Sequence, residues 1–241
     1  MTDVFSFGLY FFIGSFLQVL IYRLPRDISL LKPSYCENCL KKVRWWQNIP
    51  IFSFLFLKGR CFYCHIPLKK MLIFTEVFIF VASCLIHYYY QPYYWLYICI
   101  FYIFYCQFFI DLEHFLLMDS LNVCLLFLGI LYRLLFQESI VDGFLGLLLG
   151  ALFPGIIAWI FFKLKNQMGM GGGDIKLYGA LGMFLGPYDI FLTIFYSSLL
   201  GIVFFLLGLL FKKIKKDDPL PFGPSILIVA FVQIFLSHLY Q

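Results

Sequence analysis

Long apolar runs separated by short polar joints dominate this chain. Several runs reach the roughly 20 residues that a helix needs to cross a bilayer. Because backbone polar groups in a bilayer must be paired within their own segment, runs of this length predict α-helices. The pattern predicts about eight spans, at Val4–Ile21, Leu72–Tyr90, Tyr93–Ile110, Leu121–Phe136, Phe144–Phe162, Ile175–Leu185, Ile190–Phe211 and Ile226–Tyr240.

Two of the joints contain proline and predict tight turns, at Gln91-Pro92 and Gly186-Pro187. The sixth span, Ile175–Leu185, is too short to cross a bilayer alone. One long polar loop predicts a domain outside the membrane. The chain therefore divides into a first transmembrane helix, a loop domain and a multi-span membrane domain, at residues 1–22, 23–70 and 71–241.

The composition indicates that these apolar helices belong to a membrane protein. Hydrophobic residues make up 63% of the chain and charged residues 13%, and the mean hydropathy is +0.91. A soluble domain of this size could not bury so much apolar surface, because the buried fraction is limited by surface-to-volume scaling. The sequence therefore predicts an all-α polytopic membrane protein with a small cytoplasmic loop domain.

Positive charge is concentrated in the loop domain. Residues 23–70 hold ten of the eighteen Lys and Arg residues, and only two acids, Asp27 and Glu37. A basic loop beside membrane spans is typical of a cytoplasmic anchor to anionic lipid, so we expect membrane lipid and no nucleic acid as a partner. If the chain starts outside, seventeen of the eighteen basic residues face the cytoplasm and only Arg133 faces out. This distribution predicts a multi-pass protein of the inner (plasma) membrane.

Two acids, Asp111 and Asp174, lie at the ends of predicted spans. An ionised carboxylate in a bilayer costs roughly 2.5–3.5 kcal/mol, so two at matching depths at the cytoplasmic mouth indicate a shared task. Glycines 171–173 precede Asp174, and we expect them to allow φ > 0 and a close approach of substrate backbone. The interpretation is an intramembrane aspartyl protease. The alternatives are a flexible Gly-rich loop with a chance acid, or an Asp174 that only caps a helix.

The loop domain carries a second pattern, Cys36-x-x-Cys39 and Cys61-x-x-Cys64. Two such thiolate pairs can close a tetrahedral Zn²⁺ site. In a loop with almost no core, metal binding would supply folding free energy, about 10–16 kcal/mol in zinc-finger peptides. Disulfides are disfavoured by a reducing compartment. A c-type haem at Cys61–His65 leaves the other cysteine pair unexplained, and His65 as a replacement zinc ligand is the remaining option.

These motifs together resemble the type IV prepilin peptidases, bifunctional leader peptidase/N-methyltransferases of the GxGD aspartyl protease family. Any one motif is weak evidence, but five occur in the family's order over most of the chain. The matching segments are Gly14–Pro25, Cys36–Cys64, Ile110–Leu112, Met170–Leu177 and Pro221–Pro224. The chain departs from the family's pattern at Gln18 (usually Asn), at Met118 (usually Pro), and at Met71 and Ile73 (usually Arg and Pro).

The resemblance implies roles for individual residues. Asp111 and Asp174 correspond to the catalytic aspartates, while Gly171, Gly172, Gly173 and Lys176 belong to the motif that shapes the substrate site. Asp119 is expected to cap or support the fourth span, because Asp is a favoured N-cap. Glu76 corresponds to a supporting acid in the part of the family associated with methyl transfer.

The implied reaction is removal of a basic leader from prepilin or pseudopilin substrates on the cytoplasmic side, followed by N-methylation from S-adenosylmethionine. Neither H-E-x-x-H nor G-x-S-x-G occurs, so no rival protease motif is present. Two rivals from other classes stay open. One is an ion-coupled transporter with a structural zinc loop, since intramembrane acids also mark proton relays. The other is a zinc-loop adaptor without chemistry.

Overall fold

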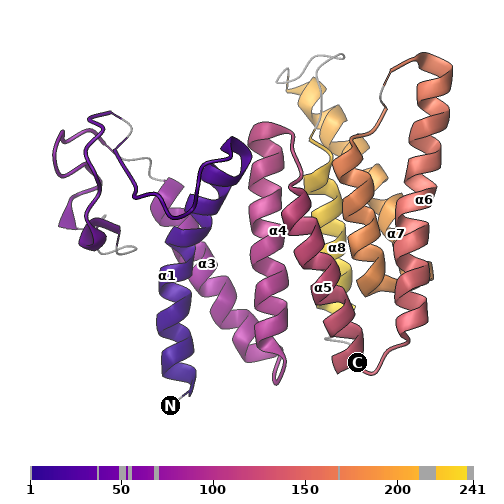
Figure 1. Ribbon diagram of the computed structural model, residues 1–241, viewed down its shortest axis with the longest axis horizontal. Helices are drawn as coiled ribbons and strands as arrows, with labels where there is room; N and C mark the ends of the chain where they lie inside the picture. Colours follow the sequence, from indigo (N-terminus) through magenta and orange to yellow (C-terminus); the bar gives the residue numbers. More distant parts are fainter. Residues whose placement is uncertain are drawn as a thin grey trace. The chain divides into compact units, whose positions relative to one another are not determined.

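In the part of the chain that the computed structural model describes, every named secondary-structure element is a helix (Figure 1). The described residues are 2–36, 38–48, 53, 56–67, 71–167, 169–211 and 221–237. The chain forms two compact units, Met1–Ile98 and Cys99–Gln241. The predicted division at residues 22 and 70 stays a prediction.

In the described residues of the first unit, two helices flank a loop. Helices α1 (Thr2–Arg23) and α3 (Met71–Tyr89) flank the short 3-10 turns η1 (Leu24–Arg26) and η2 (Trp45–Asn48). Helix α4 (Tyr94–His114) begins in this unit, after the predicted turn at Gln91-Pro92, and continues into the second. The second unit adds α5 (Asp119–Leu135), α6 (Ile140–Lys165), α7 (Gly172–Leu210) and α8 (Gly223–Ser237).

Four stretches of helix are long and apolar enough to cross a membrane, among the residues the structure describes. They are Ser6–Arg26, Tyr94–His114, Ile140–Lys165 and Gly172–Leu210, with shorter apolar helices at Ile73–Tyr89 and Gly223–Leu236. The large hydrophobic side chains exposed on these helices are accounted for by contact with lipid. The chain is therefore an all-helical, multi-pass membrane protein, while the number of eight spans stays a prediction.

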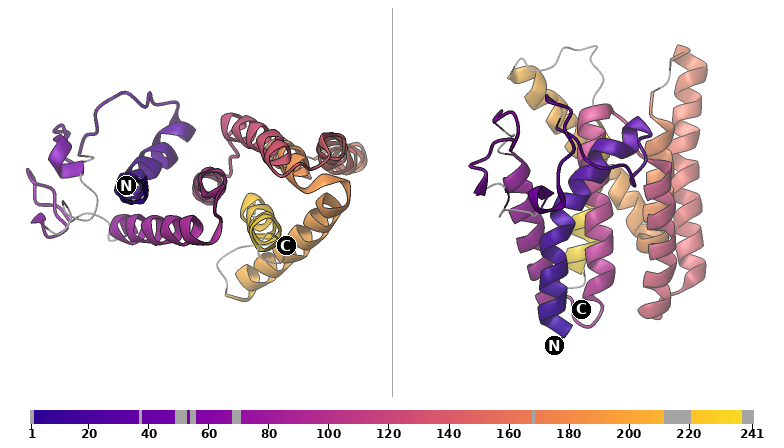
Figure 2. Two further views of the ribbon diagram at one scale, coloured as in Figure 1. Left: turned by 90° about the horizontal axis from the view of Figure 1, so that it is seen from below. Right: turned by 60° about the vertical axis from the view of Figure 1, so that its left-hand side comes forward.

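Helices α1 and α3 lie side by side in the first unit (Figures 1 and 2). Gly14 permits this approach, because a Cβ there would lie 3.1 Å from the Cα of Glu76. Two polar pairs cross the contact. The Gln18 amide donates to the Thr75 hydroxyl, and the Tyr10 hydroxyl is hydrogen-bonded to Nδ1 of His87 at 2.8 Å. Small residues and buried polar pairs are the means by which helices associate in lipid.

Helices α6 and α7 form the closest packing in the second unit. The residues that α6 buries are Gly143, Gly146, Gly150 and Pro154, spaced along one helical face. Opposite them, a Cβ on Gly182 would lie 2.1 Å from the carbonyl oxygen of Gly146. The two backbones therefore touch, and no larger residue fits at this crossing.

Helix α7 is bent at the predicted turn. Gly186 has φ 78° and ψ −176°, a backbone conformation that only glycine adopts readily. Pro187 has no N–H, so it cannot donate to the carbonyl of Met183 one turn earlier. The predicted sixth and seventh spans are thus the two arms of one interrupted helix, and the first arm ends with unpaired carbonyl groups.

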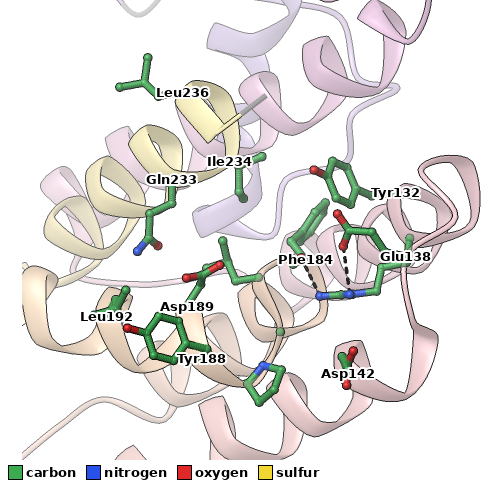
Figure 3. Close-up of a pocket in the computed structure, with 14 residues that line it drawn as sticks. Tyr132, Glu138, Asp142, Phe184, Tyr188, Asp189, Leu192, Gln233, Ile234 and Leu236 are labelled. Carbon is green, nitrogen blue, oxygen red and sulfur yellow. Dashed lines mark hydrogen bonds and ion pairs between the residues drawn. The ribbon is translucent and has the colours of Figure 1, made fainter. Parts of the chain in front are cut away.

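Arg133 of α5 satisfies those carbonyls. Its Nε donates to the Met183 oxygen at 2.7 Å and its Nη2 to the Phe184 oxygen at 3.0 Å. Nη1 donates to the Ser139 oxygen at 3.1 Å. Nη1 also pairs with Glu138 at 3.0 Å, and Figure 3 marks this ion pair with a dashed line. A cation is also favoured at this position by the dipole at a helix C-terminus. Arg133, the single basic residue that the charge pattern places outside, is therefore buried as a structural cap.

We predict that Gly182→Ala destabilises the second unit, because the new methyl group collides with the backbone of Gly146. Overpacking of this kind costs about 1–3 kcal/mol or more. The measurement is thermal unfolding of the purified protein in detergent. Gly155→Ala on the same helix pair is the matched control, since its Cβ would meet only Ile175 at an ordinary 3.8 Å. Equal melting temperatures for the two variants would contradict this packing.

Candidate active site

Asp111 lies in the last turn of α4 and is 5% exposed. The backbone N–H of Gly223, the first residue of α8, donates to its Oδ2 at 2.9 Å. A Cβ on Gly223 would lie 2.7 Å from that oxygen, so only glycine allows this contact. The positive end of the α8 dipole also favours a carboxylate at this point. The glycine of the Pro221–Pro224 motif thus donates a hydrogen bond directly to the buried acid.

Asp174 lies in the first turn of α7, where Gly171 is the N-cap residue. Gly171 has φ −68°, and the glycines with positive φ in the described chain are Gly59 and Gly186. Glycines 171–173 therefore do not adopt the positive φ that they were expected to allow. Close approach applies to two of them. A Cβ on Gly173 would lie 2.9 Å from the Cβ of Leu117, and a Cβ on Gly171 would lie 3.0 Å from Oδ2 of Asp174, whereas a Cβ on Gly172 would meet nothing within 4 Å.

Leu117 connects the surroundings of the two acids. It follows the end of α4 and lies against Gly173 at the start of α7, and its Cδ2 would lie 3.0 Å from a Cβ on Gly223. Gly223 in turn donates its N–H to the Asp111 carboxyl group, and Gly173 directly precedes Asp174. The end of α4 and the starts of α7 and α8 therefore bring the two predicted acids together.

A cavity of about 500 Å³ opens beside Asp174. Its wall comes from α6, the turn at residues 169–171, both arms of α7 and Phe222. The hydroxyl of Tyr178 in this wall is hydrogen-bonded to Oγ of Ser197 at 2.6 Å. Most of the lining is apolar, and Asp174 is its acidic group. The cavity suits an apolar chain segment presented to a carboxyl group.

Lys176 and Asp119 form an ion pair close to this junction. The Lys176 Nζ donates to Asp119 Oδ2 at 2.7 Å, and this contact joins the N-terminal parts of α7 and α5. Both side chains are more than half exposed, so the pair contributes about 0–1 kcal/mol at most. Met118, not Asp119, occupies the N-cap position of α5, and no side chain caps this helix. The capping role expected for Asp119 is therefore wrong, and a supporting role stays a prediction.

Glu76 lies in the first unit, on the face of α3 that meets Gly14 of α1. Its side chain is half-buried. The structure thus places this predicted acid in a different unit from Asp111 and Asp174. Its supporting role stays a prediction.

The four predicted cysteines gather in the loop of the first unit. The Sγ atoms of Cys36, Cys39, Cys61 and Cys64 all lie within 4.8 Å of one another, and Cys36 and Cys64 are 3.8 Å apart. A tetrahedral ion with Zn–S bonds of about 2.3 Å needs sulfur separations of about 3.8 Å. This donor set fits Zn²⁺.

The two halves of the cluster repeat one backbone design. Cys36 N–H donates to the Lys41 oxygen at 3.0 Å, and Cys61 N–H donates to the Ile66 oxygen at 2.9 Å. The residue four positions after each leading cysteine has a left-handed backbone, with φ 55° at Leu40 and 56° at His65. His65 therefore has a backbone role, and its side chain is exposed and outside the cluster.

Backbone N–H groups prepare this loop to hold anionic sulfur. The N–H groups of Cys39 and Asn38 lower the pKa of Cys36 to about 6. The N–H of Ile66 likewise lowers the pKa of Cys64. Thiolates are the form that binds a metal ion, so these two lowered pKa values favour metal binding. The N–H of Lys41 acts in the same direction on Cys39, but burial and the neighbouring thiols raise the pKa of Cys39 to about 11.

Family models match most of the chain. A model described as the bacterial peptidase A24 N-terminal domain matches residues 7–90, and a model of the type IV leader peptidase family matches residues 94–206. The boundary between the two matches falls between α3 and α4.

Curated relatives match over nearly their full length. A prepilin leader peptidase/N-methyltransferase of Dichelobacter nodosus is 30% identical, over 95% of this chain and 90% of the relative. Proteins of the same name from Stutzerimonas stutzeri and Aeromonas hydrophila are each 31% identical, over 92% and 96% of this chain and 86% and 89% of the relatives. No solved structure matches the chain.

We predict that the purified protein carries about one zinc ion per chain, and that the Cys36→Ser, Cys39→Ser double variant loses it. Metal content is measured by elemental analysis after removal of loosely bound ions. The control is Cys99→Ser, Cys124→Ser, which changes two exposed cysteines outside the cluster. Equal zinc content in both double variants would rule out the four-cysteine site.

Proposed function

This chain belongs to the type IV leader peptidase family, and we propose that Asp111 and Asp174 are the catalytic pair of an intramembrane aspartyl endopeptidase. The observation that carries the proposal is their convergence. The end of α4 supplies one carboxyl group, the first turn of α7 supplies the other, and Leu117 lies against both surroundings. Family membership does not favour the transporter or the adaptor.

In the proposed mechanism, the two carboxyl groups act on one water molecule. Two carboxyl groups that act on one water molecule cannot both ionise cheaply, so the pair would share a proton and titrate as a unit. One carboxylate draws a proton from the water as it attacks the scissile carbonyl carbon, and the other donates a proton to the carbonyl oxygen. The Gly223 N–H holds the Asp111 carboxyl group in position throughout.

The proposed substrates are prepilins or pseudopilins, cut at the cytoplasmic face. The relatives' names include prepilin leader peptidase, which supports this substrate class. The mostly apolar cavity beside Asp174 would receive the hydrophobic segment of the substrate next to the cleaved bond. The concentration of basic residues in the loop of the first unit supports the cytoplasmic orientation.

N-methylation of the new N-terminus is the second proposed activity, and the relatives' names support it. S-adenosylmethionine would supply the methyl group. The described residues show no Gly-rich nucleotide-binding turn between strand and helix, so no residue is assigned to this cofactor. The proposed role of Zn²⁺ is structural: four cysteines would hold the loop in one conformation, leaving no open coordination position for catalysis.

We predict that Asp111→Asn and Asp174→Asn each lower prepilin cleavage by about 10²–10⁴-fold, the usual contribution of a general acid or base. Cleavage of a purified prepilin is followed by the mass of the released leader. Asp142→Asn is the matched control, because this exposed carboxyl group lies in the first turn of α6 and outside the proposed site. Unchanged cleavage by either test variant, with the same melting temperature as wild type, would defeat the assignment.

We predict that Gly223→Ala lowers kcat for cleavage by about tenfold or more and leaves KM nearly unchanged. The added methyl group displaces the Asp111 carboxyl group, and misplacement by about 1 Å can cost about 100-fold. Gly8→Ala is the control, since nothing lies within 4 Å of its Cβ position. A wild-type kcat in the Gly223→Ala enzyme would show that the N–H contact does not position the acid.

A further inference from the structure

A cavity of about 790 Å³ lies at the end of α1, where the helix meets the cysteine loop. Four cations line it, and no described acidic residue does; the cations are Arg23, Lys32, Lys42 and Arg44. A concave wall with a single sign of charge creates a strong local potential. This cavity therefore favours an anionic ligand.

One of these cations builds the wall, and the other three are available to a ligand. Arg23 is buried, and its Nη1 donates to the carbonyl oxygens of Ser29 and Leu30 at 3.1 and 3.0 Å, and to that of Lys32 at 2.6 Å. The loop is thereby fixed over the end of α1. The other three residues are exposed, and none has an ion-pair partner in the described chain.

The remaining lining is aromatic and apolar. Trp46 and Tyr63 come from the cysteine loop, and Phe16 and Val19 come from α1. Trp46 is held edge-to-face against Phe62, with ring centroids 5.4 Å apart. Trp and Tyr are the side chains enriched at the headgroup level of membranes. The ligand that fits has an anionic group and an apolar part.

An exposed apolar stripe leads from the cavity along α1. Leu9, Phe12 and Phe16 are 50%, 56% and 51% exposed, and their spacing of three and four residues puts them on one face. They lie within Ser6–Arg26, which is long and apolar enough to span a membrane. A free phosphate would leave this stripe unused, whereas a lipid would have its acyl chains against it.

We propose that this cavity binds the phosphodiester headgroup of an anionic phospholipid, with the acyl chains along the stripe of Leu9, Phe12 and Phe16. Lys32, Lys42 and Arg44 contact the phosphate, while Trp46 and Tyr63 flank the headgroup. The site lies in the first unit and does not depend on the proposed peptidase pair. Its lipid binds by charge and shape, and no covalent step is involved.

The test is native mass spectrometry of the delipidated, zinc-loaded full chain, titrated with phosphatidylglycerol, phosphatidylcholine of the same acyl chains, or inorganic phosphate. We expect one phosphatidylglycerol to bind more tightly than phosphatidylcholine. Lys32→Gln, Lys42→Gln should weaken that binding by about 30-fold, since each basic residue near an anionic headgroup contributes about a fivefold factor. The matched control is Lys163→Gln, Lys165→Gln, which removes the same charge from the end of α6 and should bind like wild type.

Two further variants separate the parts of the site. Arg44→Gln should weaken phosphatidylglycerol binding by about fivefold, and Phe16→Gln should weaken it while leaving any phosphate binding unchanged. Wild-type affinity in the Lys32, Lys42 double variant, or equal affinity for the two lipids, would overturn the proposal. Displacement of phosphatidylglycerol by inorganic phosphate at equal concentration would also overturn it, because the acyl chains would then contribute nothing.

Discussion

A carboxyl group at the end of an apolar helix is stable only if the protein supplies hydrogen-bond donors that the lipid cannot. Asp111 receives such a donor from the first N–H of α8, and the contact requires a residue without a side chain at position 223. The end of α4 and the start of α8 must therefore meet, although more than a hundred residues separate them. The helices between them are arranged so that this meeting also includes the first turn of α7.

The first arm of α7 is fixed at both of its ends. At one end, Gly173 lies against Leu117, and Asp174 is placed beside the buried acid. At the other end, Arg133 donates hydrogen bonds to the carbonyl groups that the bend at Gly186 leaves without a partner in the helix. Between these two ends, the backbone of the first arm of α7 is in contact with the backbone of α6. The position of Asp174 therefore depends on glycine packing far from the two acids.

The sequence predicted the positions of the helices better than the contacts between them. The apolar runs located every described α-helix, and the proline joints located the bend in α7 and the turn before α4. Charge counting placed Arg133 outside, but it could not show that this side chain caps a broken helix, because that role depends on carbonyl groups about fifty residues away. The cysteine spacing predicted a cluster that the structure brings together.

The errors concern local backbone geometry. Glycines 171–173 were expected to allow positive φ, whereas Gly173 leaves space for Leu117 and Gly171 leaves space for the Asp174 carboxyl group. Asp119 is of a residue type that favours the N-cap position, but in α5 that position is occupied by the preceding residue, Met118. The Asp119 carboxyl group pairs with Lys176 instead. The sequence identified Gly223 only as one residue of the Pro221–Pro224 motif, and not as the hydrogen-bond donor to Asp111. The spacing of glycines along the sequence does not show which neighbouring residue occupies the space beside each glycine.

Joint action of the two acids is tested by comparing the single variants with the double variant. Cleavage of a prepilin is measured for Asp111→Asn, Asp174→Asn and the protein that carries both changes. Groups that act together give strongly non-additive losses. The account predicts that the double variant retains about the same residual cleavage as the slower single variant. A loss equal to the product of the two separate losses would contradict it, because the carboxyl groups would then act independently.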